Sequence, residues 1–251
     1  MSYLEDQDLE FLQSLTNREL EEFFNVLVYD KDGDKRLTET LSTSTEFTQH
    51  GQNYSQYWQR IAEELQCLGA NSFATLFRNG TGVPYKQILC NVCDKFKADY
   101  NQKASTENIE HKLLQRVLEK TFDSMTQSER DAVAESFGIE HTSRITSAIL
   151  TDIFVKILKI GDIYSYKFII LIVNAVLKTF IGRSMMNVEH NAFVNRTMTL
   201  LNSGIRWTMS RLCTMAEVIG PAYRVTIPAV FMVIGLRQRY INRPLLMQEN
   251  C

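Results

Sequence analysis

Helix-breaking residues are scarce in this chain of 251 residues, which contains 4 Pro and 11 Gly. Large apolar side chains are plentiful, with 14 Phe and 10 Tyr. Apolar and polar residues do not alternate over a convincing strand length, and no internal repeat is visible. These absences argue against a β-sandwich, a barrel or a solenoid, and they favour long helices.

Disulfide frameworks and targeting segments are also missing from the sequence. Five cysteines, an odd number, do not suit a disulfide framework. The first eight residues are acidic and polar, so they resemble neither a secretory signal nor an Arg-rich transit peptide. We therefore expect a bacterial-type cytoplasmic location with reduced thiols, and peripheral attachment to the inner membrane as an extension of it.

Charge is divided unevenly along the chain. Residues 1–140 carry 24 Asp/Glu and 14 Lys/Arg, a balance of −10, whereas residues 141–251 carry 5 and 13, a balance of +8. The basic part either meets an anionic partner, such as a lipid headgroup layer, or faces the acidic part within one fold. RNA is a weaker alternative, because the basic part lacks the interleaved aromatic residues of a stacking platform. Nucleic acid is therefore not an expected partner.

Hydrophobic periodicity predicts an all-α fold, a multi-helix bundle in three parts. A small N-terminal helical module (1–50) includes a capping box formed by Thr16 and Glu19. A central helical scaffold (51–140) precedes an apolar, basic C-terminal helical region (141–251). The main expected helices are 57–68, 85–96, 109–122, 128–137, 145–160, 163–181, 203–219 and 227–236.

Two C-terminal segments approach the composition of a membrane span. Phe168–Val173 is uninterrupted by polar residues, but Lys167 and Lys178 lie close to it at helical spacing. Ile227–Leu236 has only ten residues, whereas a transmembrane helix needs about 20. Buried core helices are the first interpretation, and an interfacial element or a true span remains an alternative.

An acidic turn at 30–37 resembles a calcium loop in part. Asp30, Asp32 and Asp34 occupy the first three ligand positions. However, Lys35 replaces the glycine of the sharp bend, and Leu41 stands where the bidentate carboxylate is needed. An ordinary acidic turn explains the pattern better.

No other motif points to metal, cofactor or catalytic chemistry. Cys90 and Cys93 form a lone C-x-x-C inside an expected helix, where two small buried apolar residues are the simpler interpretation. The four histidines share no metal-binding spacing, and neither a Walker loop nor a nucleophile elbow occurs. We expect no metal, no cofactor and no catalytic residue, and the chain is predicted not to be an enzyme.

Three parts of the chain resemble the YaaW family of uncharacterised bacterial proteins. The first is residues 57–72 running on to 82–92, and the second is the Ala-Tyr-Arg-Val-Thr-Ile-Pro-Ala-Val stretch 222–230, followed by an apolar run and Leu236-Arg237. The third is the opening stretch 3–12 with the acidic turn after it. Six residues of these stretches are expected to have structural roles: Trp58, Gly69, Gly82, Tyr85, Thr226 and Pro228.

The resemblance implies a distant relation to the ubiquinol–cytochrome c reductase assembly chaperones, helical proteins that assist cytochrome b at the membrane. We therefore expect a non-enzymatic chaperone or assembly factor that acts on a protein client or partner subunit at or near the membrane. The alternative is a membrane-perturbing effector that its N-terminal part holds inactive. Both interpretations allow contact with an anionic membrane surface.

The last apolar segment carries the expected contact residues. Thr226 is expected to cap its helix, and Pro228 to lie in the first turn, where a missing N–H is tolerated. Four side chains are expected to contact the partner or lipid: Tyr223, Arg224, Arg237 and Arg239. Arginines after Leu236 suit either a headgroup layer or the negative end of a buried helix.

Overall fold

The computed structural model describes most of the chain. The described residues are 3–37, 39–71, 82–136, 139, 144–184, 199, 201, 203–210 and 223–249. Within them the protein is helical, and the sole β feature is an isolated bridge between Tyr29 and Lys35. The predicted all-α class is confirmed. Of the helix expected over 203–219, residues 203–210 are helical, and the rest lies outside the described residues. Two of the four histidines, His141 and His190, also lie outside them.

The elements follow the predicted order. The N-terminal part contains η1 (Glu10–Ser14), α1 (Asn17–Val28), η2 (Leu41–Thr43) and α2 (Thr45–His50). The central part contains η3 (Tyr54–Tyr57), α3 (Trp58–Asn71), α4 (Tyr85–Phe96), α5 (Thr106–Ser124) and α6 (Gln127–Ser136). The C-terminal part contains α7 (Ser147–Ile160), α8 (Ile163–Ile181), α10 (Tyr223–Ile241) and α11 (Arg243–Glu249).

Local signals explain several helix ends. Thr16 and Glu19 form the predicted capping box at the start of α1. Gly161 adopts a left-handed conformation with φ of 74°, and Asp162 accepts a hydrogen bond from the Ser165 backbone N–H. These two residues end α7 and start α8, as the sequence predicts.

Two predicted helix boundaries are wrong. Gly69 does not end its helix, because α3 continues to Asn71. Thr226 does not cap α10, which already includes Tyr223, so Pro228 lies inside the helix. The apolar face extends through Tyr223 and Val225, and burial of that face outweighs the local signal of the proline. Proline removes one intrahelical hydrogen bond, to the carbonyl of the exposed Arg224.

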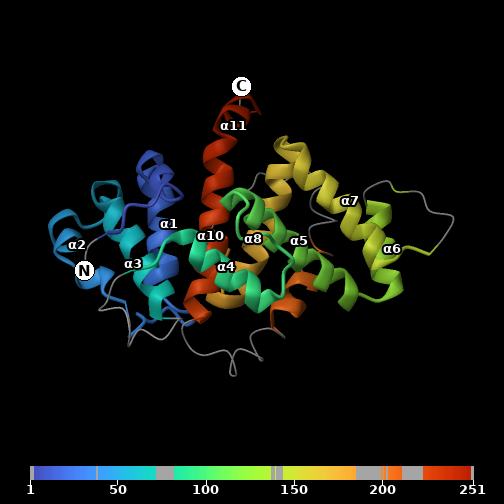
Figure 1. The fold of residues 1–251 in the computed structure, drawn as a ribbon, viewed down its shortest axis with the longest axis horizontal. Helices are drawn as coiled ribbons and strands as arrows, with labels where there is room; N and C mark the ends of the chain where they lie inside the picture. Colours follow the sequence, from blue (N-terminus) through green and yellow to red (C-terminus); the bar gives the residue numbers. More distant parts are fainter. Residues whose placement is uncertain are drawn as a thin grey trace.

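Helices α8 and α10 pack along each other in the middle of the molecule (Figure 1). Helices α1, α3 and α4 also contact α10, while α7 contacts α5 and α8. Buried apolar side chains from all three predicted parts form one cluster, which runs from Leu9 to Leu236. The N-terminal module therefore shares its core with the last long helix of the chain.

Helix α8 is the element closest to a membrane span. Among the described residues it alone is long and apolar enough to cross a membrane, judged by length and composition. However, 72% of its apolar window is buried inside the protein, and core helices of soluble proteins pass the same test. In this structure, α8 serves as the central core helix.

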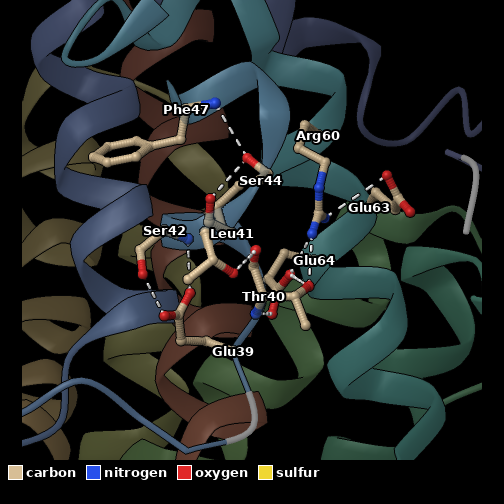
Figure 2. A network of polar contacts seen from close by, with 10 residues as sticks. Glu39, Thr40, Leu41, Ser42, Ser44, Phe47, Arg60, Glu63 and Glu64 are labelled. Atoms are coloured by element: carbon tan, nitrogen blue, oxygen red, sulfur yellow. Dashed lines mark hydrogen bonds and ion pairs between the residues drawn. The ribbon is translucent and has the colours of Figure 1, made fainter. Parts of the chain in front are cut away.

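A polar network ties the segment after the acidic turn to α3 (Figure 2). Glu64 accepts hydrogen bonds from the backbone N–H and the hydroxyl of Thr40, at 3.0 and 2.9 Å. Arg60, one turn earlier on α3, donates to the same hydroxyl and to Glu64. Glu39 accepts from the backbone N–H of Ser42. The bonds between Thr40 and α3 attach the N-terminal module to the central scaffold, and the Glu39–Ser42 bond lies within the module.

Candidate functional site

The basic end of α10 is bound to acidic parts of the same chain. Arg237 and Arg239 lie near the end of α10, and Arg243 opens α11. Each guanidinium contacts a carboxylate from another part of the sequence. Of the two alternatives for the uneven charge, the structure shows acidic and basic parts facing each other within one fold.

Arg237 lies at the centre of a buried polar cluster. The residue is 6% exposed, and its Nε donates to Glu110 Oε1 at 3.2 Å. Its Nη2 donates to the backbone carbonyl of Asp8 at 2.7 Å. The guanidinium also lies 4.8 Å from the centre of the Phe11 ring, a cation–π distance. One side chain of α10 therefore holds both the N-terminal module and α5.

Tyr85 completes the cluster from the start of α4. Its hydroxyl donates to Glu110 Oε1 at 2.8 Å, and its backbone N–H donates to Asp6 Oδ2 at 2.6 Å. Burial raises the pKa of the phenol well above its ordinary value, and the nearby Glu110 raises it further. The phenol therefore remains a hydrogen-bond donor at neutral pH. Thr106 adds a bond from its hydroxyl to Asp8 Oδ2 at 2.7 Å.

Burial and pairing oppose each other at Glu110, which is 1% exposed. Burial raises the pKa of its carboxyl group, while Arg237 and the Tyr85 hydroxyl act to lower it. The charge of Glu110 in turn helps to raise the pKa of Arg237, against the effect of that residue's own burial. Removing one partner would leave a buried charge without compensation, a change that typically costs about 3–5 kcal/mol.

The stretches that carry the family resemblance meet at this cluster. Asp6, Asp8 and Phe11 come from the opening stretch, Tyr85 from the central stretch, and Arg237 from the pair that follows the C-terminal stretch. Glu110, which joins them, lies outside these stretches and was not predicted. Its signal in the sequence was a carboxylate on the apolar face of the helix at 109–122.

The other expected structural residues of the central stretch support the same region. Trp58 packs edge-on against Tyr3, with ring centres 5.6 Å apart. Gly82 passes so close to α3 that a Cβ at this position would lie 2.8 Å from Gln66 Cβ. The Gln66 side chain donates to the Leu4 carbonyl and accepts from the Leu4 N–H. The close approach at Gly82 thus positions the segment that leads into α4 beside the opening stretch.

The outer arginines extend the contact along α1. Arg239 Nη1 lies 3.3 Å from Glu22 Oε2, and Arg243 Nη2 lies 2.8 Å from Glu19 Oε2. Arg243 also donates to the Ser14 carbonyl at 2.6 Å. Glu19 accepts from Arg243 while it closes the capping box of α1. The start of α1 and the end of α10 are therefore joined by shared hydrogen bonds.

Three of the four residues predicted to contact a partner or lipid are instead buried or paired within the fold. Arg237 is buried, and the Arg239 side chain is 15% exposed and paired with Glu22, so in this conformation neither faces a partner or lipid. Tyr223 is buried under Lys95, whose Nζ lies 4.8 Å from the ring centre. Only Arg224 of the four has an exposed position. Arginines next to an apolar core are paired with carboxylates inside the fold. The local sequence does not reveal these pairs, because the partners are distant in the chain.

Exposed apolar side chains lie near the C-terminal end of α10. They lie on two segments, the α7–α8 turn and the α10–α11 junction. Both segments line a cavity of about 320 Å³, together with Glu107 and His111 of α5. We call this the apical surface. Its exposed large apolar residues are Ile160, Tyr164, Tyr240, Ile241, Leu245 and Met247.

Residues of the acidic turn and of the C-x-x-C motif make ordinary structural contacts. Asp30 Oδ1 accepts hydrogen bonds from the backbone N–H groups of Asp32 and Asp34, as in an acidic turn. Cys90 and Cys93 lie on the buried side of α4, where burial raises the pKa of both thiols. No group of three His, Cys, Asp or Glu side chains placed to hold a metal occurs among the described residues.

The fold and the cluster define an all-helical protein whose opening segment is fastened to its last long helix by buried polar contacts. A family model described as "Domain of unknown function (DUF3944)" matches residues 3–37, which include the opening stretch, α1 and the acidic turn. A UPF0174 protein of Helicobacter pylori strain J99 is 41% identical over 237 residues, which cover 94% of this chain and 93% of that protein.

Two further relatives extend the match. A second UPF0174 protein of the same strain is 31% identical over 81% of this chain and 98% of its own length. The UPF0174 protein YaaW of Escherichia coli K12 is 28% identical over 95% of this chain and 96% of its own length. The chain belongs to the UPF0174 family. No solved structure matches it.

Proposed function

We propose that this protein is a non-enzymatic helical chaperone or assembly factor that acts on a protein partner at or near the membrane. The observation that carries the proposal is α8, a helix with the length and composition of a membrane span that is kept inside a bundle. The apical surface provides further support, because its exposed apolar side chains include residues at the start of α8. An apolar surface of this kind typically marks a contact with a protein or a membrane.

The family resemblance implies a distant relation to the ubiquinol–cytochrome c reductase assembly chaperones, and this relation would supply the class of client, a helical membrane protein. Such a relation requires an all-α fold, which this chain has. A cytoplasmic location with peripheral attachment to the inner membrane follows from the same proposal.

Site-specific photo-crosslinking in growing bacteria tests the proposal on the full chain. A photoreactive residue at the exposed positions Tyr164 or Ile160 should capture one discrete protein in the membrane fraction, whereas the same residue at Lys31 in the acidic turn should not. Cells that lack the chain should accumulate less of the captured protein. An unchanged level of that protein would contradict the chaperone function.

A second candidate function is favoured by the arginine contacts of α10. A membrane-perturbing effector needs a part that holds its apolar helices in place, and the N-terminal module binds Arg237, Arg239 and Arg243. Reversing Glu22 to Arg should weaken this restraint by repelling Arg239. Expression of Glu22→Arg should then depolarise the bacterial membrane, while wild type and Glu21→Arg should not. Normal potential in all three strains would reject this function.

A further inference from the structure

The apical surface has the form of an interfacial contact. Ile160 and Tyr164 flank the α7–α8 turn and are 65% and 59% exposed. Ile241, which lines the cavity at the end of α10, is 54% exposed, and Met247 on α11 is 69% exposed. The α7–α8 turn and α11 lie at the same end of the molecule, beside the C-terminus (Figure 1). These side chains protrude from helix ends and a turn, so they can enter a soft medium together.

The charges around these side chains complement an anionic layer. Lys156 and Lys159 are exposed beside Ile160 on α7. Two nearby carboxylates are engaged, because Asp152 pairs with Lys156 at 2.7 Å and Asp162 caps α8. A third, Glu107, lines the cavity from α5 and lies 4.0 Å from Arg237 Nη1. No carboxylate is paired with Lys159 among the described residues. Among the described residues, Lys159 is therefore a cationic group on this rim without an ion-pair partner, and the exposed phenol of Tyr164 suits the headgroup region.

We propose that the apical surface is a docking site for an anionic lipid bilayer. Ile160, Tyr164, Ile241 and Met247 enter the headgroup and upper acyl region, while Lys159 binds lipid phosphates. The inference rests on the proposed action at the membrane and gives it an orientation: the N-terminus of α8 points toward the bilayer. It also moves the lipid contact from Arg237, which is buried, and Arg239, which is paired with Glu22, to the exposed side chains of the apical surface.

Liposome flotation of the full chain tests this inference. The probes are vesicles of phosphatidylcholine alone and vesicles with about one-third phosphatidylglycerol. Wild type should float with the anionic vesicles and less with the neutral ones, and added salt should weaken binding. Ile160→Ser combined with Met247→Ser should reduce the partition coefficient at least tenfold. Lys159→Glu should reduce it on anionic vesicles only.

A matched pair of exposed apolar residues elsewhere provides the control. Leu37→Ser combined with Ile149→Ser removes similar side chains away from the apical surface and should leave flotation unchanged. Circular dichroism should show that both double variants melt like wild type, because all four sites are exposed.

Each result separates this inference from the proposed function. If the apical variant floats as well as wild type, the apical surface is not the lipid contact, while action at the membrane stands. If wild type floats with neither vesicle, lipid docking is rejected, and photo-crosslinking at Tyr164 then decides whether a membrane protein occupies this surface. Equal loss in the control variant would also reject the assignment.

Discussion

Arg237 and Glu110, 127 residues apart in the chain, meet through an Nε to Oε1 hydrogen bond of 3.2 Å in the protein interior. The same oxygen of Glu110 accepts from Tyr85, and the other oxygen has no hydrogen-bond partner among the described residues. The pair is therefore held by one shared oxygen, at a position where water is excluded. This geometry makes the stability of the fold sensitive to either partner.

Breaking this pair should destabilise the protein strongly. We expect Glu110→Gln and Arg237→Met each to lower the free energy of unfolding by about 3–5 kcal/mol, since each leaves a buried group uncompensated. The double variant should lose less than the sum of the two, because the unpaired charge is gone. Urea denaturation measures all three. Lys156→Gln, which breaks the exposed pair with Asp152, should cost below about 1 kcal/mol. Additive losses at 110 and 237 would show that the two side chains do not depend on each other.

Gly82→Ala should be destabilising by about 1–3 kcal/mol, the usual cost of overpacking. The added Cβ would lie 2.8 Å from Gln66 Cβ, an atom next to the α3 backbone that cannot move aside freely. Gly204→Ala is the matched control. The added Cβ would lie 2.6 Å from Met125 Cε, the end of a flexible side chain, and 3.0 Å from Thr121 Cγ2. The higher helix propensity of alanine offsets part of this crowding. Thermal unfolding should show a clear drop in Tm for the first variant and a small change for the second.

His111 should make stability fall as the pH is lowered. Burial lowers the pKa of this imidazole below its ordinary value of 6.5, so the folded protein resists protonation that the unfolded chain accepts. The stabilisation is complete above the unfolded pKa and is lost as the pH falls below it. Carboxyl groups with a raised pKa, such as Glu22, have the opposite effect on stability as the pH falls. The contribution of His111 is therefore measured as the difference in unfolding free energy between wild type and His111→Gln. Unfolding free energies of wild type and His111→Gln should diverge between pH 7 and pH 5. A constant difference would contradict a lowered pKa of the half-buried imidazole.

Thiol labelling should distinguish the described cysteines. Burial raises the pKa of both thiols, but Cys93 is fully buried whereas Cys67 is partly exposed. In single-cysteine variants under native conditions, iodoacetamide should modify Cys67 at least ten times faster than Cys93. In denaturing urea the two rates should become similar. Fast native labelling of Cys93 would show that α4 opens or packs differently.

Local features of the fold were predictable from the sequence, and the long-range contacts were not. The bounds of α8 match because Gly161 and Asp162 act within a few residues of the helix start. The start of α10 was missed because Pro228 is locally a first-turn residue, while burial of the upstream residues decided the outcome. Carboxylates on apolar helix faces and arginines after an apolar run were visible in the sequence. Their pairing was not, because sequence spacing carries no information about partners more than a hundred residues away.

The fastening of the first segment to the last long helix has a consequence for biosynthesis. The backbone carbonyl of Asp8 and the guanidinium of Arg237 are separated by 229 residues. At bacterial translation rates of about 5–20 residues per second, α10 is synthesised on the order of tens of seconds after the opening stretch. Until then, Phe11 and Leu12 have no α10 to cover them, and the nascent chain exposes apolar surface. The completed core can form only after release of nearly the entire chain, so this protein itself has a long interval in which a ribosome-associated holdase would prevent aggregation.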